Sequence, residues 1–161
     1  NFLIENNNIV TTEIDSQLQI NLNKNLYIEP FLVPHRNELS ETVGYKVKST
    51  EKSIIYLPDI DSWDAWKTNI IELIKENDIL FLDGTFYDKS EIVNRDINDI
   101  PHPSILESLD KLKSLDNNNR KKIYFTHLNH TNNLLRNKTD EYKYINSLGY
   151  NVATDNMKII L

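Results

Sequence analysis

Three short apolar segments, separated by segments with helical periodicity, constrain the fold of this chain more than any other feature. The apolar segments are 54–57, 79–82 and 123–125. Continuous apolar runs of this length are typical of buried strands in a parallel sheet. Elsewhere, apolar residues recur every three or four positions, which predicts helices over 62–76, 104–115 and 139–148. This alternation of strands and helices predicts a layered α/β fold.

The predicted helices carry recognisable end signals. Asp61 or Ser62 is suited to cap the first helix at its N-terminus. Ser104 and Glu107 have the spacing of a capping box at the start of the second helix. Gly149 is expected to end the third helix, because glycine adopts the left-handed conformation found at helix C-termini.

The remaining segments predict further strands around this α/β unit. Polar and apolar residues alternate in the first part of the chain, as in half-exposed antiparallel strands. We expect strands over 9–13, 17–21, 26–33, 43–48, 150–154 and 157–161. Together with the buried strands they give a mixed sheet with about three helices.

The composition of the 161-residue chain limits its chemistry and its partners. The chain has no cysteine and four histidines, so any metal must be held by histidine and carboxylate side chains. A net charge of −6 and the lack of a long basic run argue against nucleic acid or a membrane surface as a partner. No apolar stretch approaches the roughly 18 residues of a membrane span, so we expect a cytoplasmic protein. The oligomeric state stays open, a homo-oligomer included.

Residues that can bind a metal stand at the carboxyl ends of four predicted strands. They are His35, Asp59, Asp83 and His127. In α/β sheets, ligands collect in the crevice beyond the carboxyl ends of the strands, so these side chains are expected to converge. Histidine and carboxylate ligands suit zinc, iron or manganese.

Each of these residues also has a purely structural interpretation. An aspartate after a strand commonly caps a helix, which applies to Asp59, Asp61 and Asp83. His35 can equally be a hydrogen-bonded loop histidine.

Two further histidines lie close to the candidate ligands in the sequence. Alternation after the strand 123–125 sends His127 and His130 to opposite sides, so we expect only one of them to face the site, and His127 stands at the strand end. His102, between two prolines, is expected to be structural or to orient a ligand.

Five motifs occur in order around these residues. They are Phe-Leu-Val-Pro-His-Arg-Asn-Glu-Leu-Ser-Glu-Thr-Val-Gly-Tyr (31–45), Leu-Pro-Asp-Ile-Asp-Ser-Trp (57–63), Leu-Asp-Gly-Thr-Phe-Tyr (82–87), Ile-Pro-His-Pro (100–103) and Thr-His-Leu-Asn-His-Thr-Asn (126–132). Together they resemble the carboxyl-terminal half of metallo-β-lactamase-fold proteins of the coenzyme PQQ synthesis protein B type. The resemblance covers nearly the whole chain from about residue 26 onward.

The resemblance implies a four-layer αββα sandwich made of two similar halves, with a one- or two-metal site between the two sheets. It implies that His35 and His127 are metal-binding histidines and that Asp59 is the aspartate that can bridge two metals. Asp61 is the competing carboxylate.

The same resemblance gives supporting roles to three other residues, which match positions that lie behind the ligands or face the substrate. These residues are Asp83, His102 and His130.

One departure from the family pattern is large. The principal metal motif of the superfamily, His-x-His-x-Asp-His, belongs to the amino-terminal half, and the first histidine of this chain is His35. We therefore expect residues 1–161 to be a carboxyl-terminal half with an incomplete ligand set, without the half that carries this motif.

These observations favour a metal-dependent, hydrolase-like enzyme that acts on a small-molecule substrate. The divalent metal, zinc before iron or manganese, lowers the pKa of water and so activates it for attack. Asp59 would anchor the metal and orient the water, and His102, His130 and Asp83 are candidates for proton transfer.

Two alternatives remain. The first is an iron-dependent oxygenase or hydroxylase that acts on a tyrosine-derived cofactor precursor, as the resemblance implies. The second is a truncated domain that binds a partner and catalyses nothing.

Overall fold

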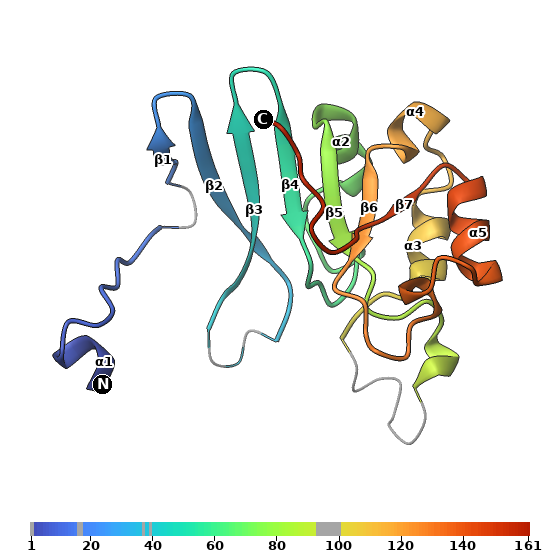
Figure 1. Cartoon of the computed structure of the whole chain (residues 1–161), viewed down its shortest axis with the longest axis horizontal. Coiled ribbons are helices and arrows are strands. Elements are labelled where there is room, and N and C mark those ends of the chain that lie inside the picture. Colours follow the sequence, from blue (N-terminus) through green and yellow to red (C-terminus); the bar gives the residue numbers. More distant parts are fainter. Residues whose placement is uncertain (1, 16–17, 37, 39, 93–100) are drawn as a thin grey trace.

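A computed structural model shows one seven-stranded sheet with the strand order β1-β2-β3-β4-β5-β6-β7 (Figure 1). It describes residues 2–15, 18–36, 38, 40–92 and 101–161. The strands are β1 Ile20–Asn23, β2 Leu26–Val33, β3 Thr42–Ser49, β4 Ser53–Leu57, β5 Ile79–Asp83, β6 Ile123–Thr126 and β7 Asn151–Val152. The predicted mixed α/β sheet is therefore confirmed.

The strand directions bring the candidate site residues to one edge of the sheet. β1 to β4 pair antiparallel, and β4 to β7 pair parallel. Because β2 and β4 are both antiparallel to β3, β2 runs in the same direction as β4, β5 and β6. The carboxyl ends of these four strands consequently lie at the same edge, the lower one in Figure 1.

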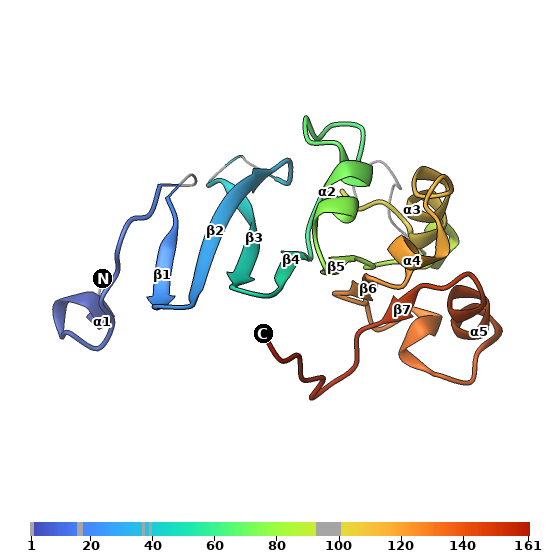
Figure 2. The same cartoon turned by 90° about the horizontal axis from the view of Figure 1, so that it is seen from above.

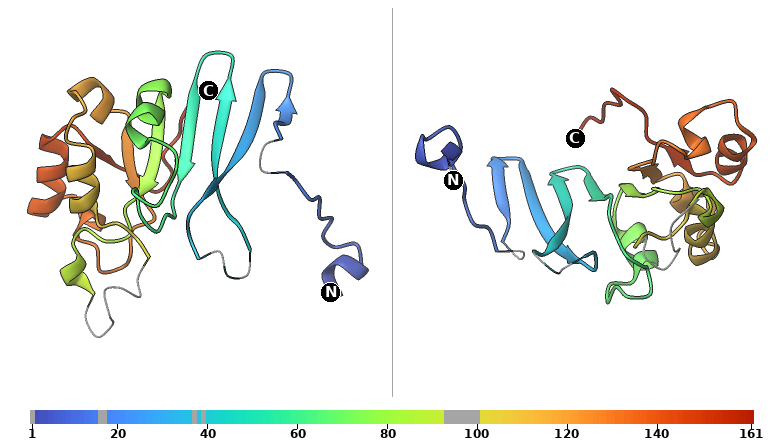
Figure 3. Two further views of the ribbon diagram at one scale, coloured as in Figure 1. Left: turned by 180° about the vertical axis from the view of Figure 1, so that it is seen from behind. Right: turned by 90° about the horizontal axis from the view of Figure 1, so that it is seen from below.

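Helices cover one face of the parallel part of the sheet. The helices are α1 Phe2–Glu5, α2 Ile70–Glu76, α3 Ile105–Lys111, α4 Asn117–Arg120 and α5 Asp140–Ser147, with 3-10 turns at Lys89–Glu91 and Asn133–Leu135. Figure 2 and Figure 3 show α2, α3 and α4 on the same side of the sheet, with α5 beside β7. Between them and the sheet lies the core, in which Leu57, Leu82 and Phe125 are fully buried.

The other face of the sheet carries a partly exposed row of aromatic side chains. Tyr45, Tyr56, Phe81 and Tyr124 are in register across β3, β4, β5 and β6. The ring centroids of Tyr56 and Phe81 lie 6.3 Å apart, and those of Phe81 and Tyr124 lie 5.5 Å apart. Tyr56 is 44% exposed. The apolar strands β4, β5 and β6 are therefore covered by helices on one face only.

The first predicted helix is much shorter than 62–76. It begins at Ile70, because Asn69 rather than Asp61 or Ser62 caps it, accepting a hydrogen bond from the Ile71 amide. Two tertiary hydrogen bonds hold the preceding segment in place. The indole of Trp63 donates to Ser108 at 2.9 Å, and that of Trp66 donates to the Leu32 carbonyl at 3.0 Å. The spacing of the tryptophans reflects these contacts and not a helix.

The other helix signals are largely correct. Ser104 and Glu107 form the capping box of α3, and Gly149 follows α5 with φ +93°. α3 ends at Lys111, short of the predicted residue 115, and the four-residue helix α4 was not predicted.

Two predicted strands are absent from the described residues. Residues 9–13 form no strand, and Val10 is 87% exposed, because the segment has no neighbouring strand to pair with. Residues 157–161 also form no strand, since the chain turns at Asn156, which has φ +61°. The strand predicted over 17–21 is found as β1 at Ile20–Asn23, and residue 17 lies outside the described residues. The strand predicted over 150–154 is shorter, because β7 contains only Asn151–Val152. None of the helices in the described part of the chain is long and apolar enough to cross a bilayer.

Candidate metal centre

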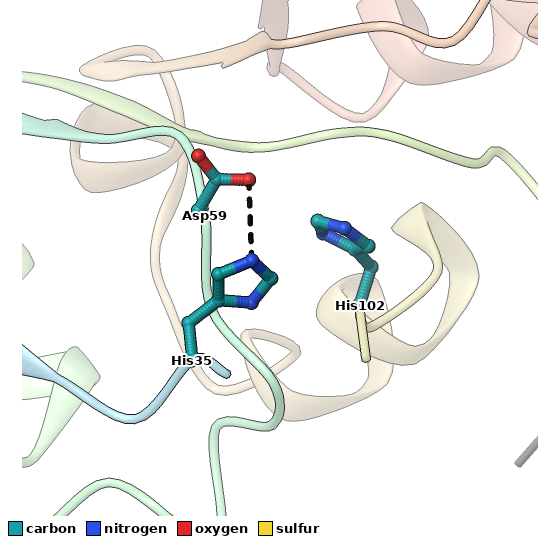
Figure 4. A group of neighbouring side chains, drawn as sticks. All are labelled: His35, Asp59 and His102. Atoms are coloured by element: carbon teal, nitrogen blue, oxygen red, sulfur yellow. Dashed lines mark ion pairs between the residues drawn. The ribbon is translucent and has the colours of Figure 1, made fainter. Parts of the chain in front are cut away.

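Histidine and aspartate side chains converge at the edge of the sheet where β2, β4, β5 and β6 end. His35 follows β2, Asp59 follows β4, Asp83 ends β5 and His127 follows β6. His102 comes from the segment just before α3 and reaches the same place. Figure 4 shows His35, Asp59 and His102 gathered around one point.

Asp59 lies between two of these histidines. Its Oδ1 atom is 3.9 Å from Nε2 of His35 and 3.4 Å from Nδ1 of His127. Ligand atoms on one tetrahedral zinc ion lie about 3.3 to 3.5 Å apart, given metal–ligand distances of about 2.0 to 2.1 Å. The spacing around Asp59 is thus close to that of ligands sharing one ion.

Two overlapping groups have one possible ligand atom per residue within 4.8 Å of one another. The first is His35, Asp59 and His102, and the second is Asp83, His102 and His127. His102 belongs to both groups. Its ring centroid lies 5.1 Å from that of His35 and 5.8 Å from that of His127.

Each of the three histidines has an oxygen atom beside its Nδ1. The distance is 3.0 Å from His35 to Asp61, 2.7 Å from His102 to Asp83 and 3.0 Å from His127 to the hydroxyl of Thr85. Metal-binding histidines usually donate the N–H of their second ring nitrogen to such an oxygen, which fixes the tautomer. With Nδ1–H as the donor in His35 and His102, Nε2 of each of these rings keeps its lone pair for a ligand, whereas Nδ1 of His127 also lies 3.4 Å from Asp59 Oδ1.

Asp83 is fully buried and its hydrogen-bonding capacity is filled. Oδ1 accepts from the amide and the hydroxyl of Thr85, at 3.0 and 2.7 Å. Oδ2 accepts from the Ile60 amide at 3.1 Å and from His102 at 2.7 Å. A carboxylate has about four acceptor positions, so Asp83 holds other groups in place and has none left for a metal.

The pKa of His102 reflects this environment. Burial on its own lowers the pKa of the ring, but the hydrogen bond and the negative charge of Asp83 outweigh that effect, with smaller contributions from Asp59 and Asp61. The net result is a pKa above the ordinary value of histidine.

The turns after β5 and β6 pack closely against each other. A Cβ atom at Gly84 would lie 2.9 Å from Cβ of Phe125, so only glycine fits between Asp83 and Thr85. The side chain of Asn132 donates to the Gly84 carbonyl at 2.8 Å. His127 has φ +59°, a left-handed conformation that is strained for a residue other than glycine.

The structure brings most of the candidate residues together. The proposed ligands His35, Asp59 and His127 meet at the sheet edge, and Asp83 and His102 lie in the same cluster. Asp61, the competing carboxylate, contacts the Nδ1 side of His35 instead, at 3.0 Å.

His130 is the exception among the candidates, because it is exposed and belongs to neither group of ligand atoms found among the described residues. Thr85 was missed as a contributor to the site. Its one signal is its place in the Asp-Gly-Thr sequence at the end of a buried strand.

A pocket of about 600 Å³ opens beside His102. Its walls include Trp63 and carry charges of both signs. Lys89 pairs with Glu107, and Lys111 pairs with Asp64. Asp61 and Asp110 add carboxylates, so acidic groups outnumber the lysines.

Comparison with known proteins places the chain in a family. The sequence model of the family described as the beta-lactamase superfamily domain matches residues 1–128. The chain belongs to the beta-lactamase superfamily. No match was found among curated proteins.

Two solved structures have a similar fold. Zn(2+)-bound PqqB from Methylobacterium extorquens has a TM-score of 0.73 and 21% identity, and the match covers 92% of this chain and 51% of that one. The metallo-beta-lactamase fold protein YhfI from Bacillus subtilis has a TM-score of 0.55 and 14% identity, with 89% and 53% covered. The chain therefore spans about half the length of these structures, and the predicted metallo-β-lactamase-like fold class is confirmed.

The residues at the sheet edge fit a divalent metal ion. Three imidazoles with their Nδ1 atoms held by oxygen, together with a half-exposed carboxylate, make a donor set that suits zinc and also iron or manganese.

Proposed function

We propose that this chain forms the carboxyl-terminal half of a metal-dependent hydrolase for a small polar molecule and contributes ligands to its metal site. The observation that carries the proposal is the position of Asp59 Oδ1, 3.9 Å from His35 Nε2 and 3.4 Å from His127 Nδ1. His35, Asp59 and His127 would hold the ion. A divalent ion there supplies Lewis-acid chemistry and lowers the pKa of water to near 7.

The chain's own residues prepare the site in three ways. Asp61 accepts a hydrogen bond from Nδ1 of His35 and so fixes the orientation of this ring, and the Thr85 hydroxyl lies 3.0 Å from Nδ1 of His127. Asp59 is half-exposed, with its side chain 32% accessible, so it can also accept a proton from a water molecule. Asp83 stays buried and keeps Thr85 and the Ile60 amide in place.

The polar pocket beside His102 is the proposed substrate site. Its ion pairs Lys89–Glu107 and Lys111–Asp64 offer donors and acceptors for a charged small molecule, and the flat ring of Trp63 forms part of the wall. Because carboxylates outnumber lysines there, we propose that the substrate carries an amino group.

The row of aromatic residues on the face of the sheet opposite the helices supports a second layer in the complete enzyme. Tyr56, Phe81 and Tyr124 form an apolar row on the face opposite the helices. We propose that residues 1–161 act as the carboxyl-terminal half of an αββα sandwich, in which a second sheet covers this face.

Hydrolysis assays on the protein with both halves of the sandwich test the proposal. We would load it with zinc, or with iron or manganese, and measure the cleavage of chromogenic esters, amides and phosphodiesters. Turnover that is lost on adding a chelator and in Asp59→Ala is expected. The absence of turnover on every substrate, or oxygen consumption by the iron-loaded chain with a tyrosine-derived peptide, would contradict hydrolysis.

A further inference from the structure

The loop that follows β6 holds His127 in a strained backbone conformation. β6 ends at Thr126, and the next residue, His127, has φ +59°. The left-handed conformation costs free energy for a residue other than glycine, and it persists only where the surrounding structure imposes it. Contacts of the loop with the rest of the chain must therefore supply the constraint.

Asn132 lies near the far end of this loop and is 2% exposed. Its side-chain nitrogen donates to the Gly84 carbonyl at 2.8 Å and to the Thr85 carbonyl at 3.3 Å. Its side-chain oxygen accepts a hydrogen bond from the Leu134 amide at 2.9 Å and so caps the 3-10 turn that follows. The buried amide group is thus hydrogen-bonded at both ends, which fixes its orientation.

The loop is tied to the turn after β5 on both sides of His127. Before the histidine, the Gly84 amide donates to the Thr126 carbonyl at 3.0 Å. After it, the Asn129 amide donates to the Thr85 carbonyl at 2.9 Å. The short segment that contains His127 therefore has fixed ends, and the left-handed conformation lets the chain span them.

The side chain of Asn132 holds this arrangement together. It adds two hydrogen bonds to the carbonyls of Gly84 and Thr85, the residues to which the backbone of the loop is also tied. Losing a buried side-chain donor leaves these carbonyls with fewer partners, which favours a rearrangement of the loop. The constraint on His127 thus depends on a residue five positions later in the sequence.

We propose that Asn132 is a positioning residue that keeps His127 at the metal centre. This rests on the proposed metal-dependent function, in which His127 contributes a ligand. Asn132 acts through the backbone, by pressing the loop against Gly84 and Thr85. Without it, His127 relaxes to an ordinary negative φ, and its ring moves away from Asp59, which now lies 3.4 Å from its Nδ1.

Matched variants of the full 161-residue chain test this proposal. Asn132→Ser keeps an oxygen that can cap the 3-10 turn, but it is too short to reach the Gly84 carbonyl. Asn132→Asp keeps the size and the acceptor and loses the donor, and it covers the case in which Asn132→Ser does not fold. The control is Asn77→Ser, because Asn77 is also 2% exposed and donates to the Leu73 carbonyl at the end of α2.

Zinc affinity, measured by competition with a chromophoric chelator, should separate these variants. We expect both Asn132 variants to bind zinc about 10- to 100-fold more weakly, the range found when residues that orient metal ligands are removed. Asn77→Ser should lower the midpoint of urea denaturation and leave zinc affinity unchanged. Unchanged affinity in both Asn132 variants overturns the proposal. An equal loss in Asn77→Ser also overturns it, because the effect would then follow from lower stability alone.

The strain at His127 gives a second measurement, which needs no metal. At φ +59° glycine is unstrained and alanine is not, so His127→Gly should unfold at a higher urea concentration than His127→Ala. When Asn132→Ser is added to both variants, the loop relaxes and the advantage of glycine should disappear. An advantage of the same size with and without Asn132 would show that other contacts impose the conformation, which contradicts the proposal.

The two proposals fail in different ways. Zinc binding that is lost in Asp59→Ala and unchanged in both Asn132 variants overturns the role of Asn132 and leaves the metal centre standing. An unchanged chain that binds no zinc overturns the metal centre, and the comparison of glycine with alanine at position 127 still decides whether Asn132 holds the loop.

Discussion

Asp83 and His102 form a hydrogen-bonded pair in which Nδ1 of the imidazole lies 2.7 Å from Oδ2 of the carboxylate. Asp83 is fully inaccessible to solvent and ends β5, and His102 precedes α3. The pair therefore ties the edge of the sheet to the helical layer at the candidate metal centre. Its contacts make Asp83 a residue on which both the fold and the site depend.

Removing the Asp83 carboxylate should destabilise the chain. Asp83→Ala leaves the amides of Ile60 and Thr85 without their partner, and each buried unsatisfied donor costs about 1 to 3 kcal/mol. We expect a loss of at least about 2 kcal/mol in the free energy of unfolding, measured by urea denaturation. Asp83→Asn keeps an acceptor and should lose less, so equal losses in the two variants would count against this explanation.

Truncation of two neighbouring residues in β4 should lower the free energy of unfolding by different amounts. Leu57 is fully buried under the helices, whereas Tyr56 is 44% exposed on the other face. Leu57→Ala should lower the free energy of unfolding by about 2 to 5 kcal/mol. Tyr56→Ala should lower it by about 1 kcal/mol or less, as expected for an exposed site with one aromatic neighbour. A larger loss in Tyr56→Ala than in Leu57→Ala, by chemical denaturation, would contradict the assignment of the two faces.

The left-handed backbone of His127 predicts an unusual order of stabilities. At most positions glycine is less stable than alanine, but at φ +59° alanine is strained and glycine is not. Without metal, His127→Gly should therefore be more stable than His127→Ala by about 0.5 to 1 kcal/mol. Thermal melts in the presence of a chelator measure this difference, and the ordinary order, with alanine the more stable, would show that the strain is absent.

Asp78 should contribute to acid denaturation. The hydrogen bond from the Ser53 backbone amide is the main cause that lowers the pKa of Asp78; burial opposes it, and the Ser53 hydroxyl lowers the pKa further. Since the pKa is lower in the folded chain, the stabilisation is complete above the unfolded pKa of about 3.9 and is lost as pH falls below it. Asp78→Asn should lose less stability than the unchanged chain between about pH 5 and pH 3.

Denaturation curves across this pH range measure the effect, with Asp155→Asn, an exposed aspartate near the end of the chain, as control. The effect is small because Asp78 is exposed. Parallel pH profiles of Asp78→Asn and the unchanged chain would show that Asp78 does not contribute.

The strands of the sheet, and the edge at which the candidate ligands lie, could be predicted because both depend on the sequence of short segments. Short apolar runs gave β4, β5 and β6, and the direction rule for parallel strands placed Asp59, Asp83 and His127 together. The capping box at Ser104 and the stop at Gly149 are likewise local signals.

What could not be predicted depends on contacts between distant segments. The tryptophans of 63–66 are held by Ser108 and the Leu32 carbonyl, and no periodicity reveals that they precede the helix. The depth of His102 in the site depends on Asp83, 19 residues earlier in the sequence. Thr85 contributes to the site through its hydroxyl, which lies within hydrogen-bonding distance of His102 and His127, and both histidines are distant in the sequence.

The metal content of the purified chain tests the central claim most directly. The full chain is incubated with zinc, passed through a desalting column and measured by atomic spectroscopy, beside Asp59→Ala and the control Asp155→Ala. We predict bound zinc in the unchanged chain and in Asp155→Ala, and its loss in Asp59→Ala, because Asp59 lies between His35 and His127. Equal zinc content in all three proteins, or none in the unchanged chain, would contradict a metal centre at this edge of the sheet.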